Sequence, residues 1–100
     1  MFTEVGFGTF VRRYLDQAKE RYGIEFGDKY PNPAVYTIDA KGAWAYEIFG
    51  GFSVRVFRWR RCDLPEVIIS GPYSAAETSE EFEARFDREF WAAIEKLRID

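Results

Sequence analysis

The sequence contains no histidine, and among its 100 residues there are only one cysteine and one methionine. Without histidine the chain lacks the commonest general base and the commonest metal ligand, so Cys–His and Ser–His nucleophiles are excluded. The single cysteine, Cys62, cannot form a disulfide within the chain, and nothing therefore indicates an oxidising compartment. We predict a non-enzymatic protein with no catalytic residues, no bound metal and no cofactor.

Long apolar runs and an excess of positive charge are also missing. No stretch approaches the roughly 18 apolar residues of a membrane-spanning helix. The N-terminal MFTEVGFGTFVRR has no basic flank before an apolar run, unlike a signal peptide. The formal net charge is −3, whereas nucleic-acid-binding domains are usually basic. We therefore expect a cytoplasmic protein that does not associate with membranes.

Aromatic residues are abundant, because the sequence has ten Phe, six Tyr and three Trp. Together with a hydrophobic content of 47%, this composition favours a folded protein over a disordered one. A chain of this length is typical of one domain, so we predict a single α+β domain over residues 1–100.

Two stretches have the apolar spacing of amphipathic helices. The first begins near Phe7 and ends at Gly23, a residue that commonly terminates helices. The second follows Thr78 and Glu81, which match the spacing of a capping box. Its apolar positions predict a buried stripe at Phe82, Phe86, Phe90, Ala93, Ile94 and Leu97. Trp91 lies on the far side of that stripe, where it is either exposed or covered by the first helix or a terminus.

In the central region apolar and polar residues alternate as in the strands of an antiparallel meander. Glycine is the third residue of each predicted loop, 40–42 and 49–51. This register sets Trp44 opposite Val56 and Tyr46 opposite Val54 on one apolar face. That face collects Tyr36, Ile38, Trp44, Tyr46, Ile48, Phe52, Val54 and Val56, and the other holds Val35, Thr37, Asp39, Ala43, Ala45, Glu47, Ser53, Arg55 and Phe57. After Val56 the alternation breaks, which predicts a bulge or a departure from the core. Residues 66–70 are predicted to form a further short strand.

The predicted fold is a two-layer α+β sandwich in the order α-β-β-β-β-α, with an antiparallel meander of three to four strands and both helices on its aromatic face. A helix, three antiparallel strands and a second helix on one face resemble the double-stranded-RNA-binding domain in element order. That family places lysines at the start of its second helix, where this sequence has Glu80, Glu81 and Glu83. The resemblance therefore implies shared architecture rather than shared function.

The stretch FGGFSVRVFRWRR, residues 49–61, has four arginines and no acid. Its arginines and rings suit phosphate contact and base stacking, which gives a nucleic-acid-binding alternative. We favour cross-strand pairing of the arginines with Glu47, Asp39 or Glu66 on the face of an ordinary sheet. Trp, Tyr and Arg also dominate the energetics of protein interfaces. The candidate partner-binding residues are Arg55, Phe57, Arg58, Trp59, Arg60, Arg61 and Trp91.

The first functional hypothesis is stoichiometric protein–protein association. A small acidic domain without site chemistry fits the general profile of toxin-immunity proteins and phage-encoded inhibitors of host defence or nucleic-acid-processing machinery. Nucleic-acid binding through residues 52–61 is the alternative. A homodimer formed through the flat outer face of the sheet is the third hypothesis.

Overall fold

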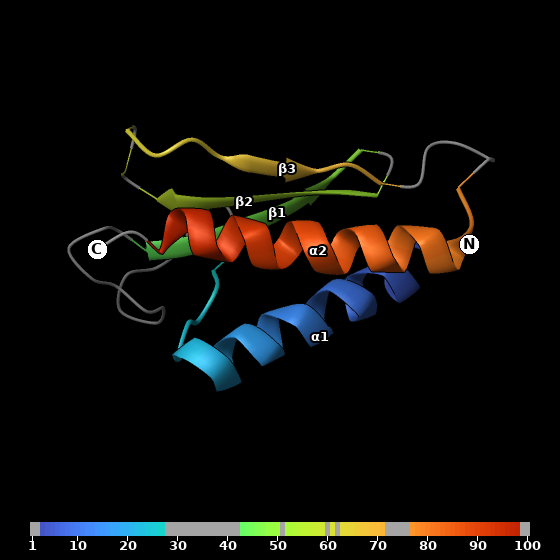
Figure 1. Cartoon of the computed structure of the whole chain (residues 1–100), viewed down its shortest axis with the longest axis horizontal. Helices are drawn as coiled ribbons and strands as arrows, with labels where there is room; N and C mark the ends of the chain where they lie inside the picture. The colour runs from blue at the N-terminus through green and yellow to red at the C-terminus, as the bar shows by residue number, and fades with distance from the viewer. Residues whose placement is uncertain are drawn as a thin grey trace.

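The computed structural model describes residues 3–27, 43–50, 52–59, 61, 63–71 and 77–98, without the side chains at positions 4 and 5. Along the chain it contains α1 (Glu4–Tyr22), β1 (Ala43–Phe49), β2 (Ser53–Trp59), β3 (Val67–Ile69) and α2 (Ser79–Leu97). The strands form an antiparallel sheet in the order β1-β2-β3 (Figure 1). The predicted α+β class is confirmed. The predicted strand around residues 35–39 lies outside the described residues, so a four-stranded layout is not confirmed.

Both helices begin and end where capping residues occur. The Thr3 hydroxyl accepts a hydrogen bond from the Gly6 amide at 3.0 Å at the start of α1, and Gly23 ends that helix with φ at 70°. At α2 the Glu81 amide donates to the Thr78 hydroxyl at 3.1 Å, and the Thr78 amide donates to the Glu81 carboxylate at 3.2 Å. The predicted capping box and glycine stop are therefore confirmed. Neither of these two described helices is long and apolar enough to cross a bilayer.

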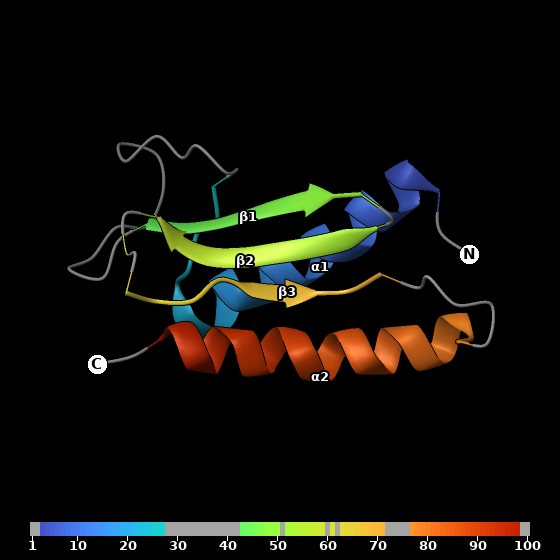
Figure 2. The same ribbon diagram turned by 90° about the horizontal axis from the view of Figure 1, so that it is seen from above.

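Both helices lie on the same side of the sheet (Figure 1). The core there combines aromatic rings with aliphatic side chains. In Figure 2, α2 runs alongside β3, and α1 crosses beneath the strands at an angle. The helices meet through Phe10 and Phe86, whose ring centroids are 4.9 Å apart. Phe26, just after α1, reaches Trp44 of β1 at 5.6 Å. Gly27 adds a bridge at the other side of β1, because its amide donates to the Trp44 carbonyl and its carbonyl accepts from the Tyr46 amide.

The register of the β1–β2 hairpin differs from the prediction by two residues. Trp44 lies opposite Arg58 and Tyr46 lies opposite Val56, so the loop is 50–52 rather than 49–51. A shift of two keeps every side chain on its expected face, and Trp44, Val54 and Val56 belong to one buried cluster as predicted. The predicted break after Val56 is wrong, because the ladder continues without interruption to Trp59.

Phe52 explains the shifted register and provides a test of backbone strain. Its φ is 61°, in the left-handed region that costs a residue with a Cβ about 1–2 kcal/mol. The ring packs 5.4 Å from the buried ring of Phe7, a contact that offsets this cost. Phe52→Ala should lose the contact but keep the strain, whereas Phe52→Gly should lose both. We expect the glycine variant to be about 1 kcal/mol more stable in urea denaturation. Equal stability, or a more stable alanine variant, would contradict strain at this position.

Candidate functional site

Arg55 is the centre of the outer face of the sheet, the face turned away from the helices. Its guanidinium lies 3.0 Å from the Glu47 carboxylate on β1 and 2.8 Å from the Glu66 carboxylate just before β3. It also stacks 4.4 Å from the centroid of the Phe57 ring. The predicted cross-strand pairing with Glu47 and Glu66 is confirmed, while Asp39 lies outside the described residues. These three charged groups sum to −1, so the network offers no net positive charge.

Phe57 and Trp59 form a ridge of rings on the same face. In the ladder, Phe57 lies opposite Ala45 and Trp59 lies opposite Ala43. Both alanines are buried, whereas both rings are partly exposed. Directly opposite side chains in an antiparallel pair have their Cβ atoms about 4.5–5.5 Å apart, so each small residue sits beside a large one. The outer face is therefore raised along β2 rather than uniformly flat.

Two apolar side chains that were not among the predicted site residues are exposed on this face. Phe49, at the end of β1, is 38% exposed, and Ile68, in the middle of β3, is 49% exposed. Ile68 lies opposite Arg55 in the ladder. The exposure of Ile68 could have been predicted from alternation along β3. Val67 and Ile69 both pack toward the core, so Ile68 between them points outward. We call Phe49, Arg55, Phe57 and Ile68 the outer-face patch.

Arg58 belongs to the interior and not to that patch. It is 3% exposed, and its guanidinium lies 4.2 Å from the centroid of the Trp44 ring. One of its Nη atoms donates to the Leu97 carbonyl at the end of α2, at 3.2 Å. A cation near a helix C-terminus is favourable, because the unpaired carbonyls there carry partial negative charge. The partner contact of Arg58 stays a prediction, for which its burial leaves almost no surface.

Arg61, at the end of the stretch, does not add an open positive surface. Arg61 forms two hydrogen bonds with the Asp63 carboxylate, at 2.7 and 2.5 Å. These bonds lower the pKa of Asp63 to about 2. The prediction for Arg60 falls outside the described residues. Of the arginines that the structure describes between 55 and 61, each is therefore engaged with a carboxylate or a helix end.

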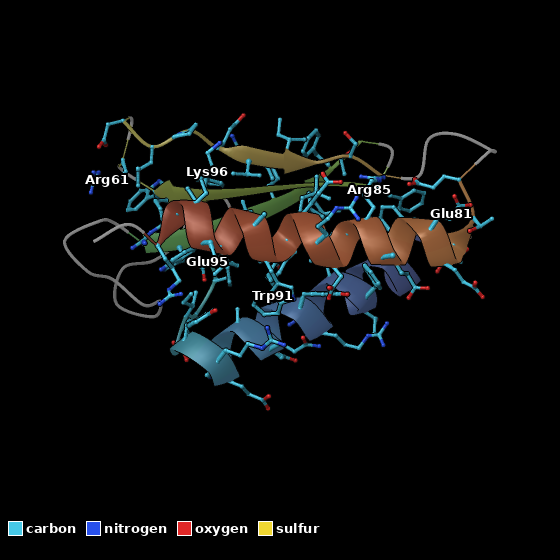
Figure 3. The ribbon with its side chains drawn as sticks, in the orientation of Figure 1. Arg61, Glu81, Arg85, Trp91, Glu95 and Lys96 are labelled. Atoms are coloured by element: carbon cyan, nitrogen blue, oxygen red, sulfur yellow. The ribbon has the colours of Figure 1, made fainter. Side chains whose placement is uncertain are left out.

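Trp91 lies between the helices, on the opposite side of the molecule from the outer face (Figure 3). Arg21 of α1 stacks over it with the guanidinium carbon 4.1 Å from the ring centroid. Its ring also meets those of Tyr14 and Tyr22, at 6.3 and 6.4 Å. Trp91 is thus partly covered by α1, which was one of the two predicted outcomes. The structure does not bring it together with Arg55 and Phe57.

Tyr14 shows how closely the helices pack. Its hydroxyl donates to the Asp87 carboxylate at 3.2 Å. Burial, and then the negative charge of Asp87, raises the pKa of Tyr14 to about 12. The raised pKa of Tyr14 therefore reflects the close packing of the two helices. No group of acidic or cysteine side chains suited to a metal ion occurs in the described part of the chain.

Sequence analysis also missed Arg85, which ties the end of β3 to α2. It donates to the Ser70 carbonyl at 2.8 Å and bonds the carboxylates of Glu77 and Glu89 at 2.8 and 3.1 Å. These contacts raise the pKa of Arg85 and lower that of Glu77. Only the Glu89 contact, one helical turn away, is visible as a sequence pattern. The network is structural. It fixes the end of β3, the strand that carries Ile68, against α2.

Comparison with known proteins adds no relative to this description. No family model, no curated protein and no solved structure matches the chain. The functional proposal therefore depends on the geometry of the described residues alone.

Proposed function

We propose that the protein is a non-enzymatic binding protein that associates stoichiometrically with a partner protein through the outer-face patch. In this proposal it acts as an inhibitor, because it covers a functional surface of a larger target. The observation that carries the proposal is the exposure of Phe49 and Ile68 on either side of Arg55, on the sheet face that neither helix covers. Apolar side chains around an arginine are typical of protein interface centres.

The electrostatics of the patch favour a protein partner over a nucleic acid. Arg55 is held between two carboxylates, and Arg58 is buried against the end of α2. A polyanion would meet Glu47 and Glu66 beside Arg55, and it would gain little from counterion release. A partner with an apolar surface bordered by basic groups could instead cover Ile68 and pair with the acids. The nucleic-acid alternative therefore loses its main support.

Ile68→Lys should weaken partner binding strongly without unfolding the protein. Lysine is well tolerated on short edge strands, and Ile68 is largely exposed, so stability should change by less than about 1 kcal/mol. A charge placed at the centre of an apolar contact should weaken affinity at least about tenfold. The measurement is the set of proteins retained by immobilised wild type and variant, followed by the dissociation constant of the purified partner.

Ala92→Lys is the matched control, because Ala92 is exposed on α2, away from the outer face of the sheet. It should retain the same partner as the wild type. Identical retention by wild type and Ile68→Lys would contradict the proposed surface. Tight binding of a labelled oligonucleotide at about 50 mM salt, with a steep salt dependence, would favour the nucleic-acid alternative. A concentration-dependent dimer that Ile68→Lys disrupts, seen by sedimentation, would assign the patch to self-association.

A further inference from the structure

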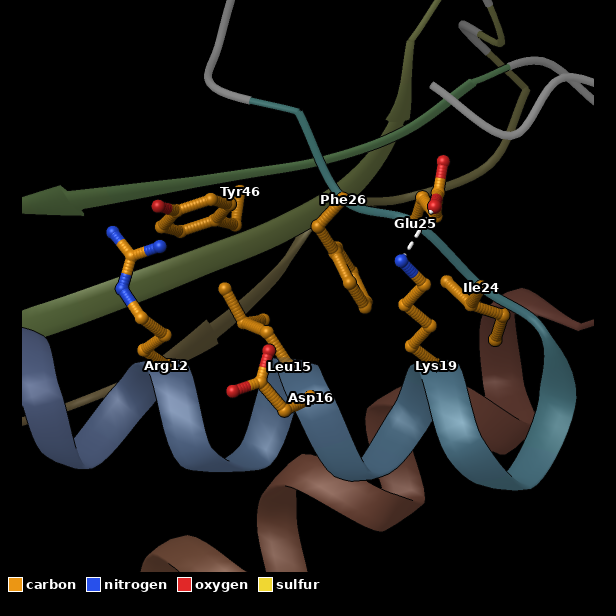
Figure 4. Close-up of a pocket in the computed structure, with 8 residues that line it drawn as sticks. All are labelled: Arg12, Leu15, Asp16, Lys19, Ile24, Glu25, Phe26 and Tyr46. Carbon is orange, nitrogen blue, oxygen red and sulfur yellow. Dashed lines mark ion pairs between the residues drawn. The ribbon is translucent and has the colours of Figure 1, made fainter. Parts of the chain in front are cut away.

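A pocket of about 350 Å³ lies between α1 and Tyr46 of β1, and residues 24–26 form a further wall (Figure 4). Leu15 and Phe26 supply apolar lining, and Tyr46 supplies an aromatic ring with a hydroxyl. Small-molecule sites usually combine an apolar lining with a few polar groups, in volumes of about 300–1,000 Å³. This pocket is at the small end of that range, which favours a ligand of amino-acid size over one of nucleotide size.

One pair of charges in this pocket is already neutralised. Lys19 Nζ lies 2.8 Å from Glu25 Oε1, and this contact joins α1 to the segment that follows it (Figure 4). The Glu25 carboxylate raises the pKa of Lys19, with a smaller contribution from Asp16. This ion pair therefore closes one side of the pocket and leaves its charges engaged with each other.

Arg12 and Asp16 are in a different state. They are one turn apart on α1, a spacing at which opposite charges commonly pair. Both line the pocket, yet the side chain of neither forms an ion pair or hydrogen bond with the described residues. In Figure 4 the Arg12 guanidinium reaches toward Tyr46, while the Asp16 carboxylate stays close to the helix. One cation and one anion thus border the same apolar space.

We propose that this pocket binds a free α-amino acid with an apolar side chain. Arg12 donates a pair of N–H groups to the ligand carboxylate, a geometry that suits its planar guanidinium. Asp16 accepts hydrogen bonds from the ligand ammonium, and the apolar side chain lies against Leu15 and Phe26. A zwitterion satisfies both charges, whereas a phosphate ester would be repelled by Asp16. This site is separate from the outer-face patch and does not depend on the proposed protein partner.

NMR titration of the ¹⁵N-labelled full chain tests the proposal with L-leucine and L-phenylalanine as probes. We expect saturable shifts in α1 and in residues 24–26. Isocaproate lacks the ammonium of leucine and isoamylamine lacks its carboxylate, so each should bind at least about tenfold more weakly. Glycine, without an apolar side chain, should also bind more weakly. The absence of saturable shifts with both amino acids, or equal binding of isocaproate and leucine, would overturn the proposal.

Two substitutions test the assigned roles. Arg12→Gln and Asp16→Asn should each weaken L-leucine binding at least about tenfold, because each removes a charge-assisted contact. Both side chains are exposed on α1, so both variants should fold, which their spectra without ligand will show. Arg13→Gln and Glu20→Gln are the matched controls on the same helix outside this pocket, and they should bind like the wild type. Unchanged affinity in Arg12→Gln or Asp16→Asn would overturn the assignment.

Discussion

Replacing Arg58 with glutamate should destabilise the protein by about 3–5 kcal/mol, the usual cost of an uncompensated charge in the interior. The new carboxylate would face the Leu97 carbonyl, which now accepts a hydrogen bond from Arg58, and the ring of Trp44. Both groups present negative electrostatic potential to it. Since a domain of this size is stable by about 5–15 kcal/mol, much of the total would be lost. Urea denaturation followed by circular dichroism measures the effect.

Two further variants separate charge from packing at this position. Arg58→Met keeps most of the apolar stem and loses the hydrogen bond, so it should cost less, about 1–3 kcal/mol. Arg61→Glu makes the same charge reversal at a partly exposed arginine paired with Asp63, and it should cost about 1 kcal/mol or less. Similar losses for Arg58→Glu and Arg61→Glu would show that the burial of Arg58 has no energetic consequence.

Phe86→Ala should cost about 3–5 kcal/mol, because it opens a cavity between the two helices. The Phe86 side chain is fully buried, and its ring lies 4.9 Å from Phe10 and 5.0 Å from Tyr14. It also lies 5.9 Å from Phe90 of its own helix. Removing this ring takes contacts from α1 and α2 together. The free energy of unfolding from urea denaturation is the measurement.

The matched control for Phe86→Ala is Phe49→Ala, the same chemical change at a side chain that is 38% exposed. It should lower stability by about 1 kcal/mol or less, since solvent fills the space that the ring leaves. Phe86→Leu should fall between the two alanine variants because it leaves a smaller cavity. A loss below about 1 kcal/mol for Phe86→Ala would mean that α1 does not pack on α2 as described.

Much of the fold could be predicted because its signals are local. The capping box at Thr78 and the glycine stop at Gly23 involve residues a few positions apart, and helical spacing alone identified the buried face of α2. The faces of the sheet were also predictable, since alternation survives a register error of two residues. The register itself was not, because Gly50 and Gly51 allow more than one loop and the distant ring of Phe7 favours the loop that contains Phe52.

The candidate site was less predictable, for a reason that Arg58 illustrates. Arginine in a strand normally indicates a solvated position, and burial becomes favourable only when a ring and a carbonyl lie within reach. Here Trp44 comes from another strand and Leu97 from the end of the last helix, so no local pattern reveals them. Pairing of Arg55 with Glu47 was predictable, because it follows from the faces of two adjacent strands.

The positions of Gly27 and α2 restrict how any other chain can approach the sheet. Gly27 forms main-chain hydrogen bonds with Trp44 and Tyr46 at the edge of β1 that does not face β2. At the other edge of the sheet α2 runs along β3, and Arg85 joins the two (Figure 2). An additional strand would have to displace one of them before it could form main-chain hydrogen bonds there. A binding partner is therefore expected to recognise side chains on the outer face of the sheet rather than add a strand to its edge. The same shielding protects a short, isoleucine-containing strand from templating aggregation.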